Sequence, residues 1–170
     1  MNQKATLFFV AVMTTACASK EEPAFKTSTG PTFQTEIFDR SSASSLFRST
    51  QKTLEAEGYA LTDVNPSLGY LSATRFFEAD TYFSDQPFGT PPPSFIGSDR
   101  ALVEVNAHIV QMNNESKLRL SLTQKAVNKA GEVIAAEPIA LQGAYDKLFS
   151  QIKSIEMSLS TRPKPARKQK

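Results

Sequence analysis

The sequence predicts an α+β fold in which a single antiparallel sheet carries two helices packed on one face. Residues 101–109 and 118–122 alternate apolar and polar side chains, as strands with one buried face do. Residues 43–57 and 143–160 instead repeat apolar side chains at helical spacing. The order helix, hairpin, loop, hairpin, helix lacks the regular strand and helix alternation of a parallel sheet, which favours antiparallel pairing.

The folded domain is expected over residues 33–160, a length that suits one hydrophobic core. Its first half is expected to contain a short strand, a helix and a two-stranded hairpin, in that order: 33–38, 42–57, 59–64 and 70–77. Asp39 and the Ser41-Ser42 pair can cap the start of the helix, and Gly58 provides its end.

The second half of the domain is expected to hold a long hairpin, a weaker strand and a closing helix: 101–109, 118–122, 132–136 and 143–160. Asn113 and Asn114 turn the long hairpin. Three alternating leucines of its second strand need a cover: Leu118, Leu120 and Leu122. The last helix supplies one through a continuous apolar stripe: Tyr145, Leu148, Phe149, Ile152, Ile155 and Leu159.

A long loop, residues 78–100, is rich in proline and glycine, and loops of this length inside a domain are usually functional or mobile. Aromatic side chains in and beside it are the candidate contacts for a partner or ligand: Phe76, Phe77, Tyr82, Phe83, Phe88 and Phe95. Two interpretations stand. The aromatic side chains fold back as a lid over the uncovered sheet face, or part of them forms an exposed contact surface for a protein or an acyl chain.

The N-terminal segment predicts export. Lys4 precedes an apolar run over residues 5–13, which has the length of a secretory signal core and about half that of a membrane span. Thr14-Thr15-Ala16-Cys17 resembles the lipobox of bacterial lipoproteins, in which a cysteine that follows a small residue is acylated. Ordinary cleavage after Ala18, which would discard the cysteine, is the alternative.

The lipobox resemblance implies a signal peptide over residues 1–16, lipidation of Cys17, which is the only cysteine, and a flexible tether over residues 17–32. By the sorting rule of such lipoproteins in Gram-negative bacteria, Ala18 implies the outer membrane, with the domain facing the periplasm. The lipid bilayer, contacted through acylated Cys17, is thus one expected partner.

Four short segments of the domain resemble small bacterial outer-membrane lipoproteins of uncharacterised function: Phe33–Asp39, Leu54–Tyr59, Leu68–Arg75 and Tyr145–Phe149. More distantly, the helix-then-hairpin order is similar to the helix-grip domains of the accessory lipoprotein of the outer-membrane β-barrel assembly machinery. Both resemblances imply a fold and a location, and neither implies an activity.

The last ten residues, 161–170, predict a disordered basic tail, because they contain two prolines, no acid and five cations: Arg162, Lys164, Arg167, Lys168 and Lys170. Of the 19 cations of the chain, one is Lys4 and five are in this tail, so the other 13 and the 17 anions leave the rest at −4. Either the tail contacts an anionic surface such as lipid head groups, or it is simply a solvated terminus.

Residues for catalysis or cofactor binding are not apparent, since no nucleophile elbow, phosphate loop, dinucleotide fingerprint or zinc-binding helix occurs in the sequence. The only histidine, His108, is expected in mid-strand on the outward face as a surface or structural residue. Glu78, Asp80 and Asp85 leave open a weak calcium site or a glycosidase-like pair, although acidic loop residues are usually just solvated. No metal, cofactor or nucleic-acid partner is predicted.

These observations predict a membrane-anchored periplasmic lipoprotein that acts as a non-enzymatic interaction or envelope-assembly accessory module, with another envelope protein as its partner. The alternative is a carrier that binds a small apolar ligand or a lipid between the sheet and the helices. An enzyme is the third possibility.

Overall fold

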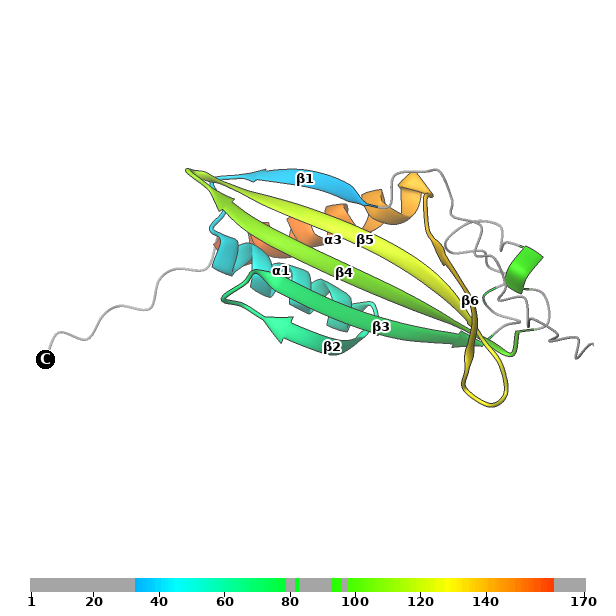
Figure 1. Cartoon of the computed structure of the whole chain (residues 1–170). Coiled ribbons are helices and arrows are strands. Elements are labelled where there is room, and N and C mark those ends of the chain that lie inside the picture. The colour runs from blue at the N-terminus through cyan, green and yellow to red at the C-terminus, as the bar shows by residue number, and fades with distance from the viewer. Residues whose placement is uncertain (1–32, 79–81, 83–92, 96–97, 161–170) are drawn as a thin grey trace, which may run out of the picture.

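The computed structural model describes residues 33–78, 82, 93–95 and 98–160. In chain order the elements are β1 (Gln34–Asp39), α1 (Ala43–Ala56), β2 (Ala60–Asn65), β3 (Tyr70–Glu78), the 3-10 turn η1 (Pro93–Phe95), β4 (Arg100–Met112), β5 (Glu115–Val127), β6 (Val133–Pro138) and α3 (Gln142–Ser160). They form one antiparallel six-stranded sheet with both helices on one side, which confirms the predicted α+β fold (Figure 1).

The strand order is β1-β5-β4-β3-β2, with β6 also paired to β5. The first half of β5 pairs with β1 and its second half pairs with β6, so these two short strands follow one another along the same side of β5. The long hairpin of β4 and β5 forms the centre of the sheet (Figure 1).

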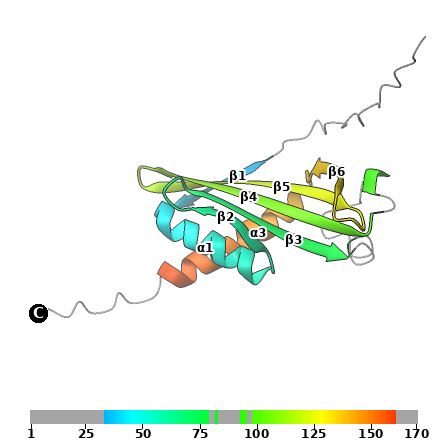
Figure 2. The same cartoon turned by 60° about the horizontal axis from the view of Figure 1, so that its bottom comes forward.

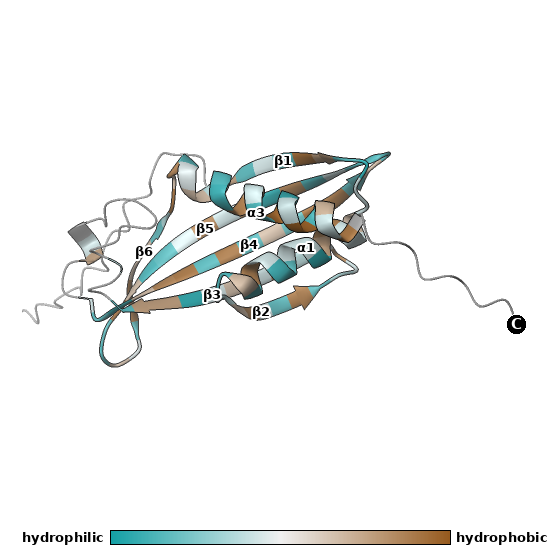
Figure 3. Cartoon of the chain, turned by 180° about the vertical axis from the view of Figure 1, so that it is seen from behind, coloured by the Kyte–Doolittle hydropathy of each residue, from teal (hydrophilic) through white to brown (hydrophobic). Residues whose placement is uncertain are grey.

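The helices and the sheet form two layers with the hydrophobic core between them (Figure 2). Leu118, Leu120 and Leu122 are fully buried, as are Tyr145 and Ile152 of α3. Viewed from behind, α1 and α3 lie across strands whose hydrophilic and hydrophobic residues alternate (Figure 3). The predicted cover of the leucines by the last helix is therefore confirmed.

Polar contacts join the two helices, which run antiparallel. The hydroxyl of Ser49 on α1 contacts the buried carboxylate of Glu156 on α3. Nearer the other end of α1, Glu57 accepts hydrogen bonds from Lys147 Nζ, at 3.0 Å, and from the side-chain amide of Gln151. The hydrogen bond from Lys147 is the main cause that lowers the pKa of Glu57 below 4.5.

A short interval between β1 and β6 leaves part of β5 without a strand partner, and backbone and side-chain groups from the α3 region fill it. The Ile139 N–H donates to the Leu122 carbonyl at 2.9 Å. The Tyr145 hydroxyl donates to the Ile139 carbonyl at 2.9 Å and accepts from the Leu122 N–H at 3.3 Å. Burial raises the pKa of Tyr145, and the bond from Leu122 partly opposes this. This side of β5 is thereby satisfied along its length.

Among the described residues, no helix is both long and apolar enough to cross a membrane.

Candidate functional site

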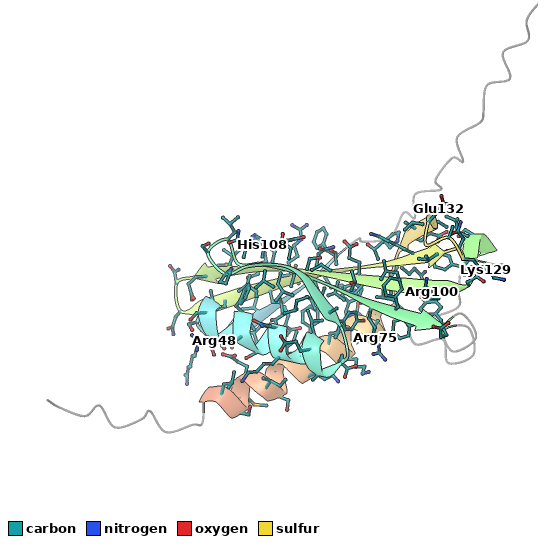
Figure 4. All side chains as sticks on the ribbon, turned by 90° about the horizontal axis from the view of Figure 1, so that it is seen from below. Arg48, Arg75, Arg100, His108, Lys129 and Glu132 are labelled. Atoms are coloured by element: carbon teal, nitrogen blue, oxygen red, sulfur yellow. The ribbon has the colours of Figure 1, made fainter. Side chains whose placement is uncertain are left out.

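The side of the sheet away from α1 and α3, here called the open face, carries the alternate residues of the same strands. Figure 4 shows His108 on this side, whereas Arg48 of α1 lies on the helix side. The predicted outward orientation of His108 is confirmed, and its side chain is exposed. Neither of the two described helices covers the open face.

A hollow of about 530 Å³, here called the central hollow, lies on the open face. Residues of β3, β4, β5 and β6, together with Phe33 just before β1, line it: Phe33, Tyr70, Asn106, Ala107, His108, Arg119, Ser121, Thr123, Ala136, Glu137 and Pro138. A neighbouring hollow of about 320 Å³ shares three of these residues, Phe33, His108 and Arg119, and extends towards Lys117. The two hollows therefore adjoin around Arg119.

A row of polar side chains crosses the sheet at this point. Thr35 of β1 pairs with Arg119 of β5, which pairs with His108 of β4, which pairs with Tyr70 of β3. Neighbouring strands lie about 4.8 Å apart, so the row spans about 14 Å. It presents a guanidinium group, an imidazole and a phenol beside one another.

Arg119 is held by an aromatic ring and not by an acid. Its guanidinium carbon lies 3.4 Å from the centroid of the Phe33 ring, within the range of a cation–π interaction. The described residues include no carboxylate that forms a salt bridge with Arg119. The guanidinium group is consequently positioned while its hydrogen-bond donors stay free of acidic partners.

The side chains of Tyr70 and Asn106 form one wall of the central hollow and begin a series of hydrogen-bonded side chains along the open face. The Tyr70 hydroxyl donates to Asn106 Oδ1 at 2.8 Å, and Asn106 Nδ2 donates to Glu104 at 2.9 Å. Lys125 Nζ forms a salt bridge of 2.5 Å with the same carboxylate. The hydrogen bond from Lys125, followed by that from Asn106, lowers the pKa of Glu104 below 4.5. These contacts fix the orientation of Tyr70 and Asn106.

The charge around the two hollows is positive. Arg119 and Lys117 line them, and the one acid in either lining is Glu137, which accepts a hydrogen bond of 2.7 Å from Ser94. The chain without Lys4 and the tail carries −4, so the open face presents a local cationic surface on an acidic body.

The predicted aromatic residues divide between the two sides of the sheet. Phe76 lies on the open face, is 57% exposed and has Arg100 at 5.4 Å from its ring centroid. Phe77 packs against the core on the helix side, with its ring 5.6 Å from that of Tyr82. Phe83 and Phe88 lie outside the described residues.

Tyr82 and Phe95 are fully buried, and they too lie on the helix side. Tyr82 donates to Gln124 of β5, and Phe95 packs with Ala126 of the same strand. Burial raises the pKa of Tyr82 to about 12. Of the aromatic side chains considered as a lid over the uncovered face, Tyr82 and Phe95 thus cover the helix side of the sheet instead, beyond the helices. The physical reason is length, since the 13-residue strands extend about 43 Å and the 19-residue α3 only about 28 Å.

Other predicted residues lie elsewhere. Cys17 and the tail cations Arg162, Lys164, Arg167, Lys168 and Lys170 are outside the described residues, as are Asp80 and Asp85. Glu78 is exposed at the end of β3. Within the described ranges, no group of three or more His, Cys, Asp or Glu side chains could hold a metal ion.

The central hollow was not predicted from the sequence. The alternation of residues 118–122 places Arg119 and Ser121 on the face opposite the leucines, but the residues that complete the hollow come from other strands. The alternation in 118–122 was the available signal, and it does not reveal which residues of β1 and β3 lie opposite.

The fold and the site together define a domain of two helices under a six-stranded sheet with a cationic open face. No protein-family model and no curated protein matches the chain. Two solved structures from bacteria are similar in part. A DUF4468 family protein from Bacteroides ovatus aligns with 9% identity and a TM-score of 0.32, covering 79% of this chain and 88% of its own. A TBP-like protein from Parabacteroides distasonis aligns with 8% identity and a TM-score of 0.39, covering 74% of this chain and 92% of its own.

Proposed function

We propose that this protein is a lipoprotein of the bacterial cell envelope that acts as a non-enzymatic interaction module and binds another envelope protein through the open face of its sheet. Acyl chains on Cys17 hold it in the outer membrane, and the domain faces the periplasm. The central hollow is the observation that supports the binding role, because it combines aromatic, polar and charged side chains on a face that no described helix covers.

The anchor and the hollow are close in the chain. Phe33 lines the central hollow and directly follows the tether of residues 17–32. A flexible segment of that length extends about 20 Å. The hollow therefore stays near the membrane surface, where a partner in the same membrane can reach it.

The carrier alternative receives less support. The side chains between the sheet and the helices are fully buried against one another, as Leu120, Leu122 and Ile152 illustrate, and they form one continuous cluster. An apolar ligand would have to displace this packing, whereas the open face offers a hollow already formed.

Site-specific photocrosslinking tests the binding role. A photoreactive amino acid replaces Thr123, which lines the central hollow, in the full chain expressed in a diderm host. The matched control carries it at Ser150, an exposed position on α3. We expect one discrete crosslinked envelope protein from position 123 and none from position 150. Crosslinks of equal yield from both positions, or none from position 123, would contradict the proposal.

The anchor is tested separately by intact mass and membrane fractionation of the wild type and of Cys17→Ala. We expect a mature N-terminus at Cys17 with three acyl chains, and a soluble variant. Cleavage after Ala18 with a soluble wild type would overturn the anchored location but not the use of the open face.

A further inference from the structure

We propose that the open face recognises an extended acidic segment of its protein partner, in which carboxylates at every second residue pair with Arg119 and Lys117. The inference rests on the proposed function and names the chemistry of the partner.

Arg119 has the properties of a carboxylate receptor. Phe33 stacks on its guanidinium group at 3.4 Å, and no described acid forms a salt bridge with it. A planar guanidinium group binds a carboxylate through two parallel hydrogen bonds, and an ordered side chain loses less conformational entropy when it does so. His108, the direct cross-strand neighbour of Arg119, adds a further polar group beside the same space.

The second cation sets the spacing of the segment. Lys117 lies two residues before Arg119 on β5, on the same face, and lines the adjoining hollow. Residues two apart on a strand are separated by about 6.7 Å, and alternate side chains of an extended peptide repeat at the same distance. An extended segment lying along β5 therefore brings acids at positions i and i+2 opposite the two cations.

Charge explains why this segment would select the open face. Glu137 is the one acid that lines either hollow, and its carboxylate already accepts a hydrogen bond from Ser94. Apart from the five tail cations, the rest of the chain has a net negative charge, which repels an acidic segment. Complementary charge at one place and repulsion elsewhere orient an encounter and suppress wrong contacts.

Fluorescence anisotropy with the full chain in detergent tests the recognition. The probe is a labelled peptide of alternating Glu and Ser, and a peptide of alternating Gln and Ser is its control. We expect the Glu peptide to bind at least tenfold more tightly, with an affinity that falls as salt is raised. Arg119→Gln should weaken binding about tenfold, and Arg119→Lys should restore part of it.

The matched control variant is Arg48→Gln, which removes the same charge from an exposed arginine on α1. Arg48→Gln should bind the Glu peptide as the wild type does. Lys117→Gln should weaken binding of this peptide severalfold. Equal binding of both peptides, or undiminished binding by Arg119→Gln, would overturn the inference. So would binding of vesicles containing anionic lipid that depends on Arg119 when the Glu peptide does not bind.

Crosslinking from Thr123 separates the two proposals. If the wild type yields a crosslinked partner and Arg119→Gln yields it unchanged, the open face binds a partner and the acidic segment is wrong. If the wild type yields none, the proposed function itself fails.

Discussion

The two faces of the sheet are made from alternate residues of the same strands, and they differ in burial and in charge. On the helix side, Leu118, Leu120 and Leu122 of β5 are fully buried. On the open face, Arg119 and Ser121 lie between them and line a hollow. Since one residue of register separates the two sets, whatever fixes the register also fixes the binding surface.

If the open face binds a partner as proposed, stability and recognition are divided between the two sides of this domain. The helix side is closed by α1, α3, Tyr82 and Phe95, so its residues contribute mainly to the free energy of folding. Substitutions on the open face should leave that free energy nearly unchanged while they alter binding.

The largest expected effect is a loss of stability from a single substitution on the helix side. Leu120→Ala removes a fully buried side chain and should lower the free energy of unfolding by about 2–5 kcal/mol, because a cavity remains. Ser121→Ala, one residue further on the open face, should change it by less than about 0.5 kcal/mol. Urea denaturation of both variants measures the difference. Similar losses for both would contradict the division of the two faces.

The second largest effect is expected at Gly69, in the turn between β2 and β3. Gly69 has φ of +63°, and a Cβ built there would lie 2.1 Å from the Ile109 carbonyl oxygen. Gly69→Ala should therefore cost about 1–3 kcal/mol, because backbone must move. Gly131→Ala is the control, since its φ is +84° but nothing lies within 4 Å of the added Cβ. Thermal denaturation should rank Gly69→Ala below Gly131→Ala, and the reverse order would contradict the close contact.

Two substitutions of aromatic residues, one on each side of the sheet, compare the contributions of the two sides to stability. Tyr82→Phe leaves the buried side chain of Gln124 without the hydroxyl that it accepts from, so it should cost about 1–2 kcal/mol. Phe76→Ser on the open face, where the ring is 57% exposed, should cost less than that. Chemical denaturation decides between them. A larger loss for Phe76→Ser would mean that the open face contributes to the core.

The smallest effect concerns pH on the open face. Hydrogen bonds from Lys125 and Asn106 lower the pKa of Glu104, so the folded state favours its charged form. The resulting stability is present above pH 4.5 and is lost as pH falls through the lower pKa of the folded state. Because the pair is partly exposed, it contributes less than about 1 kcal/mol. Glu104→Gln should have a slightly lower melting temperature at pH 7, and this difference should shrink progressively as pH falls below 4.5.

The helices and hairpins could be predicted from the sequence because their signals are local. Ser42 caps α1, its hydroxyl accepting from the Ser45 N–H at 3.2 Å, and Gly58 has φ of +81° after the helix, as the composition of this stretch indicated. The long hairpin was predicted too short, over 101–109 and 118–122. Val110, Gln111 and Met112 are all exposed, so the alternation ends at Ile109, yet pairing continues to the turn.

The binding surface could not be predicted because it depends on register between distant strands. Nothing in the local sequence places Phe33 beside Arg119 or Tyr70 beside His108. The position of the lid was equally hidden, since it follows from the excess length of β4 and β5 over the helices.

Ser49 and Glu156 meet across the helix interface although they are 107 residues apart in the sequence, and β1 pairs with β5 late in the chain. Such non-local contacts require the chain to lose loop-closure entropy before their favourable free energy is gained. Folding should therefore be slow, in the range of milliseconds to seconds. β1 has no strand partner, and α1 lacks its contacts with α3, until the second half of the chain is available. In the export that we propose, β1 and α1 would therefore cross the membrane before these partners are available to them.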